Sequence, residues 1–134
     1  MTLIFIVSVV LGLILAWLLL THSAPADHAG ILERFNLDPK DYVLMAADVG
    51  GYSKKIRLSA NGAHGDPDAL IRARVGDELI VGEVKSRAYR GTVRPYERYQ
   101  LTLYLGAACR RYPRQRVYGL ICYSNRVVRL EYDD

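Results

Sequence analysis

The chain of 134 residues is small, basic and poor in cysteine. Roughly 105 residues follow an apolar N-terminal segment, which leaves room for one domain with a modest core. The net charge of +4 and the pI near 9.2 favour a polyanionic partner or an anionic membrane surface. The two cysteines, Cys109 and Cys122, argue against a disulfide-stapled scaffold and are typical of small buried side chains in a reducing compartment.

The N-terminal segment, residues 3–20, is uncharged and almost wholly apolar. As a helix it would extend roughly 27 Å, at about 1.5 Å per residue, which is close to the hydrocarbon thickness of a bilayer. Residues 1–22 are therefore predicted to form a single transmembrane anchor. A cleaved signal peptide is the alternative, because Ala24-Pro25-Ala26 resembles a small-residue cleavage site. The length of the apolar run and the lack of Lys or Arg before it favour the anchor.

The charges that flank the anchor predict its orientation. Basic side chains follow the span and none precedes it; they are Arg34, Lys40, Lys54 and Lys55. Because positive charge is retained on the cytoplasmic side, the globular part is expected in the cytoplasm. Residues 23–40 are interpreted as a juxtamembrane linker with a short helix, and residues 41–134 as the folded domain.

Strand-like runs surround one predicted helix in the folded domain, an order that fits an α/β fold. The predicted strands are residues 42–47, 54–60, 68–75, 78–86, 117–123 and 126–132, with a Gly-rich loop at residues 61–65.

The third and fourth of these strands are predicted to form a tight hairpin closed by Gly76 and Asp77. In that register Leu70 faces Glu83 and Asp68 faces Lys85. Because side chains alternate along a strand, all four project from one face of the sheet.

Two carboxylates and a lysine on one face suit metal-assisted phosphodiester hydrolysis. Carboxylate oxygens are ligands for Mg²⁺ or Mn²⁺, and a neighbouring lysine can orient the attacking water. A solvated Glu-X-Lys face with a cross-strand ion pair is the simpler interpretation of Glu83 and Lys85 alone. However, both follow the apolar run of residues 79–81, which predicts a buried strand where an unpaired charge is costly.

The predicted helix starts near Pro95 and runs without glycine or proline through residues 96–105. An apolar stripe at helical spacing would face the sheet, and Gln100 and Tyr104, four residues apart, share a neighbouring face. Tyr104 could equally be a core residue, whereas a half-buried amide such as Gln100 needs polar partners. A basic cluster that could contact phosphates follows at Arg110, Arg111, Arg114 and Arg116.

Three motifs in order carry a family resemblance: Gly-Asp-Pro-Asp-Ala-Leu at residues 65–70, Gly-Glu-Val-Lys-Ser at residues 82–86, and Gln-X-X-X-Tyr at residues 100–104. Together they resemble the PD-(D/E)XK nuclease superfamily, in particular its RecB-like branch of CRISPR-associated and related exonucleases. The resemblance implies a restriction-endonuclease-like core, a mixed central sheet flanked by helices.

The resemblance also implies roles for single residues. Asp68 and Glu83 match the acidic metal ligands, the backbone carbonyl of Val84 matches a further ligand, and Lys85 matches the lysine that assists the attacking water. Gln100 and Tyr104 match a helical pair that contacts nucleic acid or supports the lysine.

The chain also departs from the family pattern. Members of this branch often have an upstream histidine ligand, for which His22, His28 and His64 are available here. His28 and His64 are the candidates, although each is more simply a surface histidine. Several relatives carry a four-cysteine iron–sulfur cluster, and no such cluster is expected here because the chain has two cysteines.

The expected function is that of a membrane-anchored, Mg²⁺- or Mn²⁺-dependent deoxyribonuclease, whether endonuclease or exonuclease, with DNA and the membrane as partners and no particular protein partner indicated. Two alternatives stay open. One is an inactive nucleic-acid-binding or scaffold module of the same fold, and the other is an exported basic binding domain, released by signal-peptide cleavage.

Overall fold

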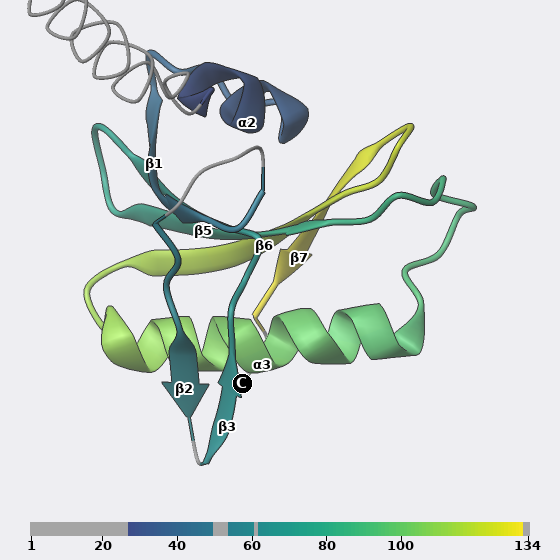
Figure 1. Ribbon diagram of the computed structural model, residues 1–134. Coiled ribbons are helices and arrows are strands. Elements are labelled where there is room, and N and C mark those ends of the chain that lie inside the picture. Colours follow the sequence, from purple (N-terminus) through teal and green to yellow (C-terminus); the bar gives the residue numbers. More distant parts are fainter. Residues whose placement is uncertain (1–26, 50–53, 61, 133–134) are drawn as a thin grey trace, which may run out of the picture.

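The computed structural model describes residues 27–49, 54–60 and 62–132, and places them in a mixed α/β fold built around a mixed five-stranded sheet (Figure 1). The elements are α2 His28–Arg34, β1 Tyr42–Ala47, β2 Leu58–Ala60, β3 Ala63–Gly65, β4 Ala69–Ala73, β5 Glu78–Val84, α3 Pro95–Arg111, β6 Arg116–Cys122 and β7 Val127–Glu131. The strand order is β1-β4-β5-β6-β7, in which only β5 and β6 are parallel. Helix α3 is the crossover that joins these two parallel strands.

The predicted anchor at residues 1–22 lies outside the described residues. Within residues 27–49, 54–60 and 62–132, no helix is long and apolar enough to span a bilayer.

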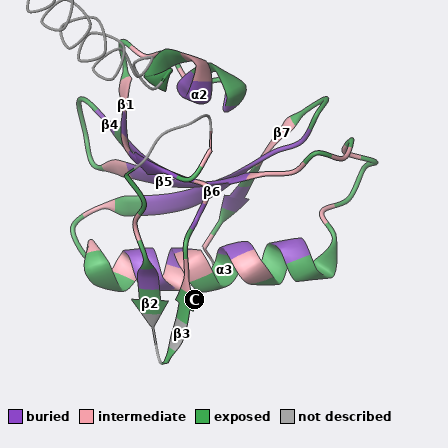
Figure 2. Ribbon diagram, viewed as in Figure 1, coloured by how far each residue is buried: buried purple, intermediate pink, exposed green. Residues whose placement is uncertain are grey.

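The sheet lies between α2 on one face and α3 on the other, and each face has its own apolar cluster (Figures 1 and 2). Strand β5 is buried on both faces. Its residues Leu79 and Val81 pack in the cluster that contains α3, whereas Ile80 packs with α2. By the same alternation, Glu83 belongs to the α3 face. The sheet therefore presents the end of β5 to the helix that carries Gln100.

The β4–β5 hairpin differs from the predicted one. The turn is longer than two residues, because β4 ends at Ala73 and β5 begins at Glu78. The register pairs Leu70 with Val81 rather than with Glu83. This is a shift of two residues, so every side chain keeps its predicted face. Continuing the register by one residue beyond the Ala69–Gly82 pair aligns Asp68 with Glu83, instead of with Lys85.

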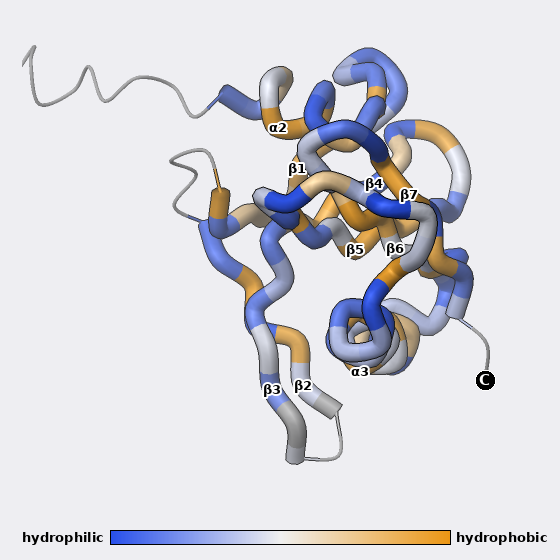
Figure 3. Tube along the Cα trace, turned by 90° about the vertical axis from the view of Figure 1, so that its right-hand side faces the viewer, coloured by the Kyte–Doolittle hydropathy of each residue, from blue (hydrophilic) through white to orange (hydrophobic). Residues whose placement is uncertain are grey.

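The region predicted as a strand and a Gly-rich loop instead forms a second, small sheet. Only Leu58–Ala60 of the predicted strand is extended, and it pairs with Ala63–Gly65, which was expected as loop. This β2–β3 hairpin packs against α3 and runs across it, away from the main sheet (Figures 1 and 3). The buried side chain of Leu58 packs into the same apolar cluster as α3, and this packing against the helix stabilises a strand too short to be recognised from its own pattern.

Helix α3 starts where the sequence predicts. Pro95 occupies its first turn, and the side chain of Glu97 accepts a hydrogen bond from the backbone N–H of the N-cap residue Arg94. The predicted stripe of Leu101, Leu105 and Ala108 is buried against the sheet. Because that stripe faces the sheet, the neighbouring face with Gln100 lies at the border of the core, where it is half-buried.

Candidate active site

Asp68 and Glu83 meet at the start of β4 and the end of β5. The backbone N–H of Val84 donates to Asp68 Oδ2 at 2.7 Å, and the carbonyl of Asp68 accepts from the backbone N–H of Asp48 at 2.9 Å. These bonds hold the Asp68 carboxylate against the end of β5. Glu83 is 3% exposed, so one member of the carboxylate pair is fully withdrawn from water.

The electrostatics of Glu83 reflect this placement. Burial, and next the negative charge of Asp68, raise the pKa of Glu83 to about 7, although Lys85 opposes the shift. Within the described part of the chain, Glu83 Oε1 is buried and has no hydrogen-bond partner. This oxygen has no donor among the described residues and lies next to a second carboxylate. A bound cation would therefore stabilise the negative charge of the pair.

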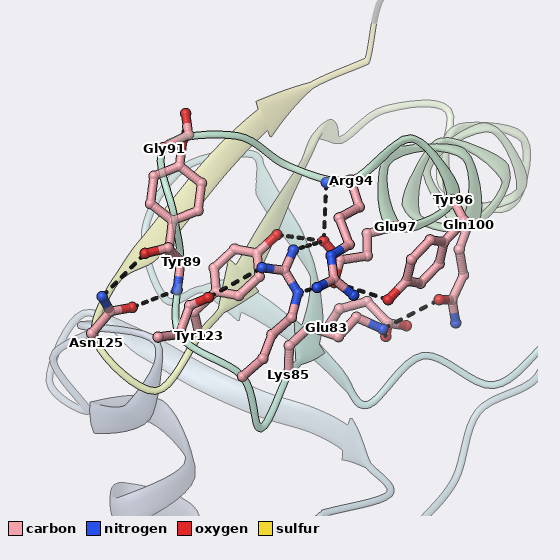
Figure 4. Close-up of polar contacts among 12 residues, drawn as sticks. Glu83, Lys85, Tyr89, Gly91, Arg94, Tyr96, Glu97, Gln100, Tyr123 and Asn125 are labelled. Carbon is pink, nitrogen blue, oxygen red and sulfur yellow. Dashed lines mark hydrogen bonds and ion pairs between the residues drawn. The ribbon is translucent and has the colours of Figure 1, made fainter.

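Lys85 connects the carboxylates to α3. Its Nζ donates to Glu83 Oε2 at 3.2 Å and to Gln100 Oε1 at 3.3 Å, as Figure 4 shows. The amide of Gln100 then donates from Nε2 to the hydroxyl of Tyr104 at 3.3 Å. Tyr104 also packs against the apolar cluster. Tyr104 therefore packs in the core and also contacts Gln100, while its role at a functional site stays a prediction.

The donor set fits a small divalent cation with oxygen ligands. Mg²⁺ is commonly held by one or two carboxylates and keeps several waters, so Asp68 and Glu83 are sufficient protein anions for it. The Val84 carbonyl, implied as a further ligand by the family resemblance, belongs to the residue whose N–H binds Asp68. Across the described ranges, no group of three or more His, Cys, Asp or Glu side chains is positioned to share one ion.

The two histidine candidates lie apart from each other. His28 is exposed on α2, which covers the face of the sheet opposite to α3. His64 is exposed on β3 and lines a pocket together with Tyr104. Neither joins the Asp68–Glu83 pair in a metal-binding group among the described residues. His22 lies outside the described residues.

An ion pair that the sequence analysis did not identify lies beside Lys85. Glu97 is 1% exposed, and both of its carboxylate oxygens accept hydrogen bonds from the guanidinium of Arg87. Oε1 accepts from Nε at 2.9 Å, and Oε2 accepts from Nη2 at 2.5 Å. Glu97 Oε2 also accepts from the hydroxyl of Tyr123 at 2.8 Å and from the backbone N–H of Arg94 at 3.2 Å (Figure 4). Burial raises the pKa of Glu97, but the bonds from Arg87, Tyr123 and Arg94 outweigh it and hold that pKa at about 2.

This pair ties the segment after Lys85 to the start of α3. The guanidinium of Arg87 also lies over the ring of Tyr123, 4.7 Å from its centroid. Two sequence signals were available. Arg87 continues the period-two alternation of Glu83 and Lys85, and Glu97 stands at the capping-box position after Pro95.

The predicted basic cluster does not form a single patch. Arg110 and Arg111 lie in the last turn of α3, where Arg111 donates to the backbone carbonyl of Arg57 at 3.2 Å. Arg116 forms an ion pair with Glu78 at the other end of β5. Arg110 and Arg111 therefore share the side of α3 that the β2–β3 hairpin covers, whereas Arg116 lies elsewhere.

No model of a known protein family matches the chain, and no curated protein matches it either. Among solved structures, the chain is similar to the crystal structure of SSO0001, with 21% identity over 95% of this chain and a TM-score of 0.38. The chain spans about half, 54%, of the length of that protein. A likeness at this level carries no argument about function.

Proposed function

We propose that the folded domain is a metal-dependent nuclease that hydrolyses phosphodiester bonds of DNA, with a restriction-endonuclease-like core of the PD-(D/E)XK type. The observation that carries the proposal is the convergence of Asp68, Glu83 and Lys85 on one face of the sheet. Glu83 Oε1 is left there without a partner among the described residues. Buried carboxylate oxygens normally have a hydrogen-bond partner, so the Oε1 atom of Glu83, which has none among those residues although Oε2 is paired with Lys85, supports a site for a ligand.

Some of these side chains would bind the metal, and others would position the attacking water or the phosphate. Asp68 and Glu83 would hold Mg²⁺ or Mn²⁺, which supplies polarisation of the phosphate and activation of a water when bound. The ammonium of Lys85, oriented by Glu83 and Gln100, donates to the attacking water or to the charge that develops on the phosphate. Tyr104 holds the amide of Gln100 and so keeps Lys85 aimed at the carboxylates.

The same proposal includes a membrane anchor at the N-terminus, with the nuclease domain in the cytoplasm. The apolar run of residues 3–20 and the basic residues that follow it support this part. The protein would then act on DNA close to a membrane.

The test is digestion by the purified full-length chain. End-labelled single-stranded and double-stranded DNA would be incubated with Mg²⁺, with Mn²⁺ or with EDTA. Loss of full-length DNA with either ion, and none in EDTA, is the expected result. Intact DNA under all three conditions, with correctly folded protein, would reject the nuclease proposal.

A second candidate is a nucleic-acid-binding module that keeps the fold without turnover. It is favoured by the ion pair between Lys85 Nζ and Glu83 Oε2 at 3.2 Å, because that pair already compensates one buried charge without a metal. Binding of DNA in the absence of any digestion would support this candidate.

A further inference from the structure

A pocket lies between the β2–β3 hairpin and α3, directly beside the candidate active site. Its cavity volume is about 340 Å³, within the range of pockets that hold small organic groups. The residues that define its chemistry are Leu58, His64, Leu103, Tyr104, Arg110 and Tyr132.

Two glycines bring aromatic rings into the walls of this pocket. A Cβ atom at Gly65 would lie 2.0 Å from Tyr104 Cε1, so only glycine lets that ring pack on the β3 backbone. A Cβ atom at Gly106 would lie 3.1 Å from the hydroxyl oxygen of Tyr132. Glycine at these two positions therefore leaves room for both rings to lie close to the backbone in the pocket walls.

The chemistry of the walls matches a nucleobase. Three ring side chains, His64, Tyr104 and Tyr132, and two leucines offer stacking and apolar surfaces. Arg110 in the last turn of α3 adds positive charge to the lining. Aromatic surface next to a cation is the combination that binds a base together with its phosphate, and the net charge of +4 agrees with a polyanionic ligand.

The pocket and the candidate active site share a side chain. Tyr104 forms part of the pocket wall, and its hydroxyl accepts the bond from Gln100 that continues to Lys85 and Glu83. A base held against Tyr104 would thus place its own backbone next to the carboxylate pair. A base inside a duplex is stacked and paired, and so cannot enter such a pocket without leaving the helix.

We propose that this pocket binds one unpaired nucleobase of the substrate strand and so sets which phosphodiester bond lies at Asp68 and Glu83. The inference rests on the proposed function, since it assigns a subsite to that same site. Unpaired strands or frayed ends are then bound in preference to closed duplex.

Binding without cleavage tests the proposal. The full-length chain in EDTA would be titrated into a single-stranded oligonucleotide that carries 2-aminopurine, whose fluorescence falls on stacking, and into the matched duplex. We expect quenching with the single strand only. The variants His64→Ala and Leu103→Ala should weaken single-strand binding roughly tenfold, the order expected for loss of stacking with one base. Both residues are exposed, Leu103 at 43%, so the fold should tolerate either change.

The matched control is Tyr99→Ala, which removes an aromatic ring, 68% exposed, from the same helix but outside the pocket lining. It should change the affinity less than twofold. Equal losses for all three variants would show a general aromatic surface and overturn the pocket, as would absent quenching or unchanged affinity of the pocket variants. A pocket that binds single strands in a protein that never digests DNA with Mg²⁺ would support base binding by the pocket, and would reject the nuclease proposal together with the role of the pocket in choosing the bond.

Discussion

Lys85 at the end of the central strand β5 donates a hydrogen bond to the side-chain carbonyl of Gln100 on α3, at 3.3 Å. The bond joins the sheet to the helix beside the carboxylates of Asp68 and Glu83, at the edge of the core. It also gives the lysine two acceptors, Glu83 and Gln100, which restrict its direction more than an ion pair alone.

Comparison of Asp68→Asn with Lys85→Ala should separate metal binding from water activation. Asp68→Asn keeps an acceptor for the Val84 N–H but loses an anionic ligand, so both calorimetric Mg²⁺ binding and DNA digestion should be abolished. Lys85→Ala leaves both carboxylates, so Mg²⁺ should still bind while digestion falls at least a hundredfold. Asp66→Ala, which removes a carboxylate in an exposed ion pair with Arg57, is the control and should digest DNA normally. Digestion by Lys85→Ala at the parent rate would reduce Lys85 to an ion-pair partner.

Gln100→Ala should lower digestion roughly tenfold or more, because Lys85 loses one of its two acceptors and Tyr104 loses its donor. The melting temperature should change by no more than a few degrees, since Gln100 is only half-buried. Gln115→Ala removes another half-buried glutamine, just before β6, and should leave digestion unchanged. If both variants digest DNA as the parent does, Gln100 has no role at the site.

The raised pKa of Glu83 predicts a pH dependence of stability. The folded protein retains the proton of Glu83 up to about pH 7, whereas the unfolded chain releases it near the ordinary value of 4.5. The unfolded state therefore binds fewer protons between these values, and the free energy of unfolding falls as the pH rises from about 4.5 to 7. The total effect is on the order of 3 kcal/mol.

Glu83→Gln removes this titration, so the free energy of unfolding of the variant should not show this fall. The difference between variant and parent should therefore grow as the pH rises from about 4.5 to 7. Urea unfolding at several pH values without metal measures it. A constant difference from pH 4 to 8 would contradict the raised pKa. Because the ion and the proton compete for the same carboxylate, Mg²⁺ affinity of the parent should increase as the pH passes through about 7.

The Arg87–Glu97 pair should be a major source of stability. Arg87→Ala leaves the buried carboxylate of Glu97 without its cation, which should lower the free energy of unfolding clearly more than removal of an exposed arginine does. Since the folded pKa of Glu97 is lowered to about 2, the contribution is complete above about pH 4.5 and is lost as the pH falls toward 2. Arg90→Ala, an exposed arginine in the same segment, is the control in urea unfolding. A loss for Arg87→Ala no larger than the loss for Arg90→Ala would show that solvent replaces the guanidinium.

The proposed anchor predicts that the protein extracted from membranes keeps its N-terminus. Mass spectrometry should give the mass of the full chain, and alkaline washing should leave the protein in the membrane fraction. A mass lacking the residues up to Ala26, with the protein in the soluble fraction, would support the exported alternative.

Local sequence patterns were enough to predict most strands of the sheet and to predict that the two acidic residues share one face. β1 occupies its predicted range, and α3 begins at Pro95, because alternation and capping are properties of short segments. Asp68, Glu83 and Lys85 share one face as predicted, although the predicted two-residue turn was wrong. The register moved by two residues, and a period of two returns each side chain to the same face.

Tertiary packing decided the rest. The β2–β3 hairpin exists because Leu58 is buried against α3, a contact between segments that no local pattern encodes. The bonds from Lys85 to Gln100 and from Arg87 to Glu97 depend on how the crossover helix lies on the sheet. The amino-acid sequence by itself determined which side chains alternate onto one face. The packing of β5 against α3 decided which of these side chains are buried, paired or left with an oxygen that has no partner in the described part of the chain. The reason is that burial and pairing depend on neighbours distant in the chain.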